Sequence, residues 1–460
     1  MRGDFSRDTF KPEKQYAGVL MQQGRLSLDA DWNEHGDILR HYMRRLARDL
    51  IGPHGGPRDD LGFEIIVDAA VLDERLSRAG APATQRATLL RAIESGAFVI
   101  GPGRYYVEGI AIENDGFIAY TGQPGYPLPG SPPLDQLRAS RYLVYLDVWE
   151  RLVTYVEDPG IREVALGGAD TTVRSQVIWQ VRVLPARAGA PLDPGIVAGF
   201  GATGSGRLRA RAPSPNRYSG AENRLYRVEI HAGGAAGGAT FKWSRRNGAD
   251  IYPISGVTRR DPTHLVAELA PGAAPSSRLA VDDRVELFDD EYELRNSADP
   301  LLVVAELDAA KGLVTLDDAA GRSSVRADGK HSLLRRWDQR GEASLGWASL
   351  VANAADQPSP PNWLTLEDGI EIAFSASGDY RTGDYWLIPA RPATGDIEWP
   401  HERDDQGNPV LGGDGSPVTA ALLPRGPKHA YAPLAVRDPN DGLHDYRREL
   451  PQARRVASKG

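Results

Sequence analysis

The sequence predicts a mainly β protein that has α+β character only at its N-terminal end, with several small antiparallel sheets or barrels and one substantial N-terminal helix. Three observations support this fold class. From residue 98 onward, apolar residues recur at the period of two that is typical of strands. The chain contains 50 Gly and 34 Pro, which indicates many turns. Residues 31–51 combine a helix start, an apolar stripe and a stop signal.

The stretch from residue 20 to residue 53 carries the most consistent local signals. Leu26 and Leu28 alternate with polar residues, as in a half-buried strand. Asp31 followed by Glu34 matches the D-x-x-E pattern that begins a helix. Gly52-Pro53 then ends the helix. Between these signals, apolar residues recur at helical spacing and form one stripe: Ile38, Leu39, Tyr42, Met43, Leu46, Leu50 and Ile51.

We predict that the corner between this strand and this helix is architectural. Its caps and ion pairs are expected to come from Arg25, Asp29, Asp31 and Glu34. Asp31→Ala would then cost about 1 kcal/mol through the lost cap. Trp32 is expected to be largely buried, so that Trp32→Ala would cost about 3–5 kcal/mol.

A calcium loop starting at Asp29 is the alternative interpretation of this corner. The pattern Asp29-Ala-Asp31-Trp-Asn33 begins like an EF-hand loop. However, Glu34 occupies the sixth position, where Gly is required, and Arg40 occupies the twelfth, where Glu is required. The strand-to-helix corner with its cap is therefore favoured.

Changes in composition and period divide the rest of the chain. Residues 84–95 predict a second helix, and residues 141–156 and 172–184 predict long strands. We expect four regions: 1–120, a strand–helix region with a β-meander; 121–200, a long-stranded β region; 201–330, a β domain with a small barrel at about 278–318; and 331–460, a Trp-rich C-terminal β domain with a charged tail.

Composition excludes several function classes. The net charge of −8 argues against a general nucleic-acid binder. The absence of cysteine excludes disulfides, thiolate catalysis and Cys-ligated metals. No apolar run is long enough to insert in a membrane, and the first residues do not resemble a signal peptide. We expect synthesis in the cytoplasm without a signal peptide, and an extracellular location only as part of a released particle.

The motifs that carry chemistry do not identify a catalytic, cofactor or metal site. The Gly-rich stretch 201–206 lacks the Lys-Ser/Thr of a phosphate-binding loop. The side chains of Arg207, Arg209 and Arg211 would share one strand face, where they could contact an anion or simply be solvated. Catalysis would require titratable groups that converge in one cleft; the example we test is Asp289, Glu291 and His331.

Tryptophan is concentrated in the last third of the chain. An aromatic platform for a sugar is one interpretation of this cluster, and packing in a core or an interface is the favoured one. The five residues are Trp337, Trp347, Trp363, Trp386 and Trp399.

Several motifs together resemble a bacterial domain family of unknown function. The opening contributes Gly3-Asp-Phe-Ser-Arg-Asp-Thr-Phe and Val19-Leu-Met-Gln-Gln-Gly-Arg-Leu-Ser-Leu-Asp-Ala-Asp-Trp-Asn-Glu. Later matches include Ile100-Gly-Pro-Gly-Arg-Tyr-Tyr-Val-Glu-Gly, Tyr145-Leu-Asp-Val-Trp-Glu-Arg and Tyr380-Arg-Thr-Gly-Asp-Tyr-Trp-Leu-Ile-Pro-Ala-Arg. Members of that family occur near phage-tail-like and contractile-injection-system genes. The resemblance implies a context and no catalytic residues.

We therefore expect a non-enzymatic structural or accessory component of a phage-tail-like particle. Its partners would be other particle proteins and further copies of the chain, with a trimer favoured and residues 1–19 contacting a neighbour. A carbohydrate-binding or adhesion module that uses the tryptophan cluster is the alternative, with a glycan as its ligand. A glycan hydrolase or lyase is the third hypothesis.

Overall fold

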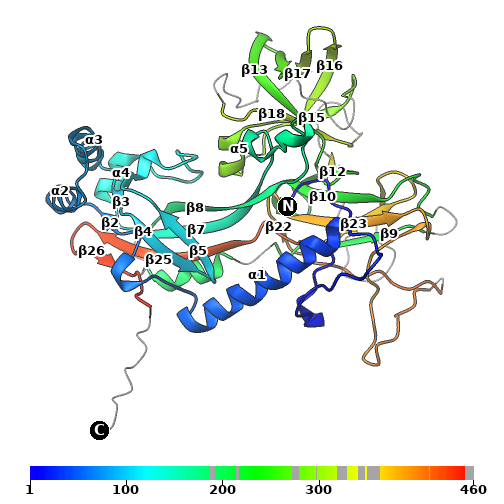
Figure 1. The fold of residues 1–460 in the computed structure, drawn as a ribbon, viewed down its shortest axis with the longest axis horizontal. Helices are drawn as coiled ribbons and strands as arrows, with labels where there is room; N and C mark the ends of the chain where they lie inside the picture. The colour runs from blue at the N-terminus through cyan, green and yellow to red at the C-terminus, as the bar shows by residue number, and fades with distance from the viewer. Residues whose placement is uncertain are drawn as a thin grey trace.

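The computed structural model describes residues 1–186, 192–201, 204–213, 217–271, 279–296, 298–318, 329–339, 348–349, 363–413 and 415–450. It confirms the predicted fold class, since six open sheets and one closed barrel account for most of the ordered elements in these ranges. Figure 1 shows the barrel above a long β body, with the helix α1 crossing the lower edge of that body.

The helices are few, and all but one are short. The exception is α1 (Asp29–Ile51), and the others are α2 (Ala69–Arg78), α3 (Ala83–Glu94), α4 (Leu134–Ala139) and α5 (Asp290–Arg295). Single 3-10 turns occur at η1 (Pro12–Lys14), η2 (Arg58–Asp60), η3 (Tyr120–Gly122), η4 (Pro159–Ile161), η5 (Val164–Leu166) and η6 (Pro194–Gly199). No helix in the described ranges has the length and hydropathy needed to span a bilayer.

The first half of the body is a sheet that both ends of the chain share. Its strand order is β26 (Gly442–Asp445), β25 (His429–Asp438), β7 (Tyr142–Val153) and β8 (Arg174–Pro185), all antiparallel. Two smaller sheets complete this half: β1 (His54–Gly55), β4 (Gly103–Val107) and β5 (Ile110–Asn114), and β2 (Ile65–Ile66), β3 (Val99–Ile100) and β6 (Ile118–Ala119). β7 is central, as its two apolar faces predict, and its residues help form the largest core cluster.

The second half packs a five-stranded sheet against a three-stranded one. The larger sheet has the order β19 (Ala348–Ser349), β12 (Thr240–Ser244), β10 (Arg224–Ala232), β23 (Tyr385–Arg391) and β24 (Asp396–Ile397). The smaller one has the order β20 (Leu364–Thr365), β21 (Glu371–Phe374) and β9 (Leu208–Arg211), and β11 (Gly234–Ala235) pairs with β22 (Asp379–Tyr380). Aromatic residues from both sheets share one core.

The barrel is larger than the sequence predicts. Its strands follow the order β13 (Ile251–Asp261), β14 (His264–Leu269), β17 (Leu313–Asp317), β16 (Leu302–Asp308), β15 (Arg284–Phe288) and β18 (Leu333–Trp337). The predicted limits of about 278–318 contain only three of these strands. Because β13 and β18 close the barrel by pairing with each other, the unit extends on both sides of those limits.

The α1 helix corrects three predictions about the opening motif. The helix begins at Asp29 after the N-cap residue Leu28, and no side chain caps it, so the predicted Asp31 cap is wrong. Residues 25–28 are not a strand, and Arg25 is exposed without an ion pair to any described residue. Trp32 is 81% exposed, so its predicted burial is wrong. The physical reason is that the helix buries its other face, through Ala30 and Ile38.

Two of the predicted motif residues instead hold the N-terminal arm. The Asp29 carboxylate accepts a hydrogen bond from the backbone N–H of Ser6 at 2.8 Å. The Glu34 carboxylate accepts one from the hydroxyl of Thr9 at 2.5 Å. Residues 1–10 therefore run from α1 toward the centre of the molecule, where Figure 1 places the N-terminus.

Candidate functional site

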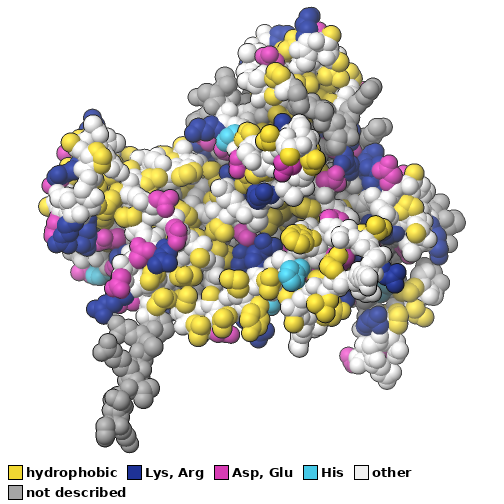
Figure 2. Space-filling model, viewed as in Figure 1, with side chains coloured by type: hydrophobic (Ala, Val, Ile, Leu, Met, Phe, Trp, Pro, Cys, Tyr) yellow, Lys and Arg dark blue, Asp and Glu magenta, His cyan; other side chains and the backbone are white. Residues whose placement is uncertain are grey.

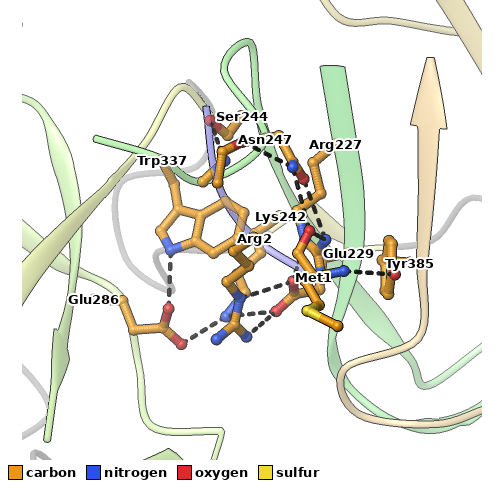
Figure 3. Close-up of polar contacts among 12 residues, drawn as sticks. Met1, Arg2, Arg227, Glu229, Lys242, Ser244, Asn247, Glu286, Trp337 and Tyr385 are labelled. Carbon is orange, nitrogen blue, oxygen red and sulfur yellow. Dashed lines mark hydrogen bonds and ion pairs between the residues drawn. The ribbon is translucent and has the colours of Figure 1, made fainter. Parts of the chain in front are cut away.

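A buried network of charges lies where the N-terminal arm, the five-stranded sheet and the barrel meet (Figure 3). Glu229 of β10 is its centre and is only 1% exposed. Its carboxylate pairs with Arg2 at 2.6 Å, with Arg227 at 2.5 Å and with Lys242 at 3.5 Å. One carboxylate thus faces three cations, a ratio that requires further acids nearby.

The strand register explains how these side chains come together. Arg227 and Glu229 are two residues apart on β10, so both point to the same side of the sheet. Lys242 on β12 and Tyr385 on β23 stand directly opposite Glu229 on the two flanking strands. The intervening β10 residues point into the aromatic core of the second half.

The barrel supplies the second carboxylate. Glu286 of β15 pairs with Lys242 at 2.6 Å. It also accepts hydrogen bonds from the Tyr292 hydroxyl at 3.0 Å and from the Trp337 indole N–H at 3.1 Å. Lys242 therefore bridges one acid from the five-stranded sheet and one from the barrel, and the two units are joined by a buried ionic contact.

The network shifts the proton affinities of its acids downward. Burial alone would raise the pKa of Glu229, but Arg2, Arg227 and Lys242 bring this pKa well below its ordinary value. Burial likewise opposes ionisation of Glu286, yet Lys242, Arg2 and Arg335 lower its pKa to about 2. Both carboxylates are therefore charged across the physiological pH range.

The network accounts for the opening tripeptide Arg2-Gly3-Asp4. The Arg2 guanidinium reaches Glu229. The Gly3 N–H donates to the backbone carbonyl of Asn247, and the Asn247 side-chain amide donates to the Gly3 carbonyl. Asp4 pairs with Arg246 at 2.7 Å. These contacts fix the arm to the five-stranded sheet and give the tripeptide an internal structural role.

A cleft of about 1110 Å³ opens from this network and runs beneath α1. Its walls are the inner face of α1, the N-terminal arm, β7, β8, α5 and residues 424–429. Most cations in the cleft are paired: Arg44 with Glu150 at 2.9 Å, for example, and Arg151 with Asp290 and Glu293 at 3.4 Å. The arrangement is a charged surface whose ion pairs connect α1 and the barrel to the sheet of the first half.

One titratable pair lies at the far wall of the cleft. The Asp147 carboxylate contacts Nδ1 of His429 at 2.5 Å and Arg182 at 3.1 Å, which joins β7, β25 and β8 across the sheet. The Trp149 ring stacks on the His429 imidazole with centroids 4.9 Å apart. The imidazole is thereby held between an acid and a ring.

The triad tested for catalysis does not converge. Asp289 accepts the backbone N–H of Tyr292 at 2.7 Å and caps α5. Glu291 pairs with Arg295 at 2.7 Å along the same helix, and His331 contacts Asp290 at 2.8 Å. None of the three lines the described cleft. In the described ranges, no group of three or more His, Asp or Glu residues is placed to hold a metal ion.

The tryptophans predicted as interface or ligand residues separate into different environments. Trp337, Trp386 and Trp399 are buried, the first in the charge network and the others in the core of the second half. Trp363 is partly exposed, and the Arg211 guanidinium lies 4.0 Å from its ring centroid. Trp347 lies outside the described residues. The four described residues therefore do not form one exposed platform.

The three arginines predicted to share a strand face are engaged within the protein. Arg209 pairs with Glu402 at 2.7 Å, and Arg211 pairs with Glu371 at 2.8 Å. Arg207 donates to the carbonyl of Ala421 at 3.0 Å. These contacts attach residues 402–421 to β9 and occupy the groups that an anion would use.

Comparison with known proteins identifies a family but no similar curated protein or solved structure. The sequence model of a family of unknown function, DUF6519, matches residues 1–194 and 190–447. No curated protein matches the chain, and no solved structure does.

Proposed function

We propose that this chain, which belongs to the DUF6519 family of unknown function, is a non-enzymatic structural or accessory component of a phage-tail-like, contractile-injection particle. The observation that carries the proposal is the apolar face that α1 presents to solvent. Figure 2 shows hydrophobic side chains gathered along the lower edge of this view, where α1 lies.

Exposed apolar surface of this extent is typical of a protein–protein interface. Monomeric proteins rarely expose contiguous apolar patches of more than a few hundred Å². Seven large apolar side chains on one helix face are exposed here: Leu28, Trp32, Leu39, Tyr42, Met43, Leu46 and Leu50. The buried ionic network supports the same role, because it joins the barrel and the sheets into one body that can serve as a building block.

The particle context comes from the resemblance of the opening and later motifs to proteins encoded near phage-tail-like genes. The test is co-fractionation of the tagged chain with sedimented tail-like particles in its native host, measured by mass spectrometry. Association that is lost in a Leu39→Asp/Leu46→Asp variant supports the proposal. A chain absent from every particle fraction would contradict it.

The carbohydrate-binding alternative now depends on Trp363 among the described tryptophans. A glycan array with Trp363→Ala as the control tests this alternative directly. Specific binding that disappears in the variant would favour a lectin-like role over a structural one. The hydrolase or lyase hypothesis stays a third prediction, without a specific observation in its favour.

A further inference from the structure

The helix α1 is oriented with its polar face inward. Its inner face pairs with the body through Arg44 and Glu150 at 2.9 Å and through Arg48 and Glu108 at 2.9 Å. The opposite face is apolar and exposed, with Tyr42 at 70%, Met43 at 68% and Leu50 at 66%. Because ion pairs hold the inner face, rotation of the helix to bury the apolar stripe would break them.

The apolar stripe is symmetric about Leu39 toward its two ends but not next to Leu39, where Tyr42 and Met43 have Gly36 and His35 at the mirror positions. Seven residues before and after Leu39 are Trp32 and Leu46, and eleven residues before and after it are Leu28 and Leu50. Spacings of seven and eleven are close to two and three helical turns, so all these side chains lie on one face. When a second copy runs in the opposite direction, Trp32 of each copy faces Leu46 of the other.

The charges of α1 are divided between its two halves. Residues 29–39 contain four acids and no Lys or Arg, whereas residues 40–51 contain four arginines and one acid. Parallel helices would place like charges side by side. Antiparallel helices place the acidic half of one copy beside the basic half of the other. Arg44 and Arg48 already pair with Glu150 and Glu108. Asp29 and Glu34 hold the N-terminal arm, so the complementarity available to a second copy comes from the charges on the flanks of the exposed face.

One specific ion pair completes the match. Asp31 and Arg45 lie on the same flank of the stripe, eight residues before and six residues after Leu39, and the exposed Arg45 also borders the cleft. Neither forms an ion pair within the described part of the chain. In an antiparallel pair, the Asp31 carboxylate of one copy lies within reach of the Arg45 guanidinium of the other, and this contact occurs twice.

We propose that α1 pairs antiparallel with α1 of a second copy of this chain, about a two-fold axis at Leu39. This contact is isologous, which means that each copy contributes the same surface. Leu20 and Met21 are also exposed, and the neighbouring Val19 N–H contacts Nδ1 of His35 at 3.4 Å, so this segment lies on the same face of the helix and would be part of the interface. A two-fold pair differs from the three-fold assembly that the sequence analysis favoured.

This inference rests on the proposed function, which takes this face to be an interface. Experiments can nevertheless refute either one without refuting the other. A chain that dimerises yet is absent from particles would refute the particle role alone. A chain that is monomeric in isolation yet enters particles through α1 would refute the antiparallel pair alone. The tests below therefore use the isolated full-length chain.

Single cysteines measure the direction of pairing, because the chain contains none of its own. Leu39→Cys should cross-link to itself under mild oxidation. Trp32→Cys and Leu46→Cys should not cross-link to themselves, since those positions in an antiparallel pair are about 21 Å apart. Mixed together, the two variants should form a heterotypic disulfide, read by non-reducing electrophoresis. Lys311→Cys, at an exposed position on the barrel, is the control and should form no cross-link.

Light scattering and sedimentation measure the assembly. We expect a mass of two chains, reduced to one chain in Leu39→Asp/Leu46→Asp and unchanged in Val164→Asp, an exposed apolar control away from α1. Asp31→Arg should weaken the dimer about tenfold, and Asp31→Arg/Arg45→Asp should restore it. Matched thermal unfolding shows that the variants are folded. A monomer, a trimer, or a Trp32→Cys self-cross-link would overturn the proposal.

Discussion

Replacing Glu229 by Gln tests the buried network at its centre. The substitution keeps the shape of the side chain and removes the charge that pairs with Arg2, Arg227 and Lys242. The three cations stay buried around a neutral amide, and breaking a buried ion pair in this way typically costs about 3–5 kcal/mol. We expect a loss of that size in the free energy of unfolding. The loss should include loosening of the barrel, because Lys242 also contacts Glu286.

Urea denaturation followed by tryptophan fluorescence measures this loss, because Trp337 donates to Glu286 within the network. The matched control is Glu74→Gln, which removes an exposed pair with Arg78 on α2 and should cost less than about 0.5 kcal/mol. The network also sets a pH dependence. The folded-state pKa of Glu286 is lowered to about 2, so its stabilisation is full above about pH 5 and is lost as the pH falls toward 2. If Glu229→Gln unfolds as the control does, the network contributes nothing and our reasoning is wrong.

Three further predictions follow from burial. Trp32→Ala should change the free energy of unfolding by less than about 0.5 kcal/mol, because the side chain is exposed; a loss above 2 kcal/mol in chemical denaturation of the monomer would contradict this. Trp386→Ala should cost about 3–5 kcal/mol in the same assay, because that ring is in the core. Burial raises the pKa of Asp384 to about 6, so its contribution to stability is full below about pH 4 and is lost as the pH rises through 6. Asp384→Asn should therefore gain stability over the parent chain, on the order of 2 kcal/mol, between pH 4 and pH 7; a difference that does not change with pH would argue against the shift.

The existence of α1 and its end at Ile51 could be predicted from the sequence, but its first residue and its orientation could not. Helical periodicity identifies an apolar face and a polar face, and the usual assumption is that the apolar one is buried. Here the arginines of the polar face pair with Glu150 on β7 and with Glu108 in the turn between β4 and β5. Those acids are far away in the chain, so no local pattern identifies them, and the prediction for Trp32 failed for this reason.

The charge network was missed because its pattern is ambiguous. Along β10, Arg227, Glu229 and His231 alternate with apolar residues, and such alternation normally indicates a solvated strand face. In the folded protein, the N-terminal arm and the barrel cover this face. The sequence of the strand alone does not show that the face is buried. The barrel was predicted from its β16–β17 hairpin, a local element. Its closure by β13 and β18 is a contact between distant segments.

The position of β25 has a consequence for the order of events during biosynthesis. This strand pairs with β7 from His429↔Trp149 to Arg437↔Tyr142, so nearly 300 residues are translated between the two partners. Until β25 emerges from the ribosome, the hairpin β7–β8 exposes one unpaired, largely apolar edge. The first half of the body cannot fold completely before the second, because its central strand, β7, pairs with β25 near the end of the chain. We therefore expect fragments that end before residue 429 to be more prone to aggregation than the whole chain.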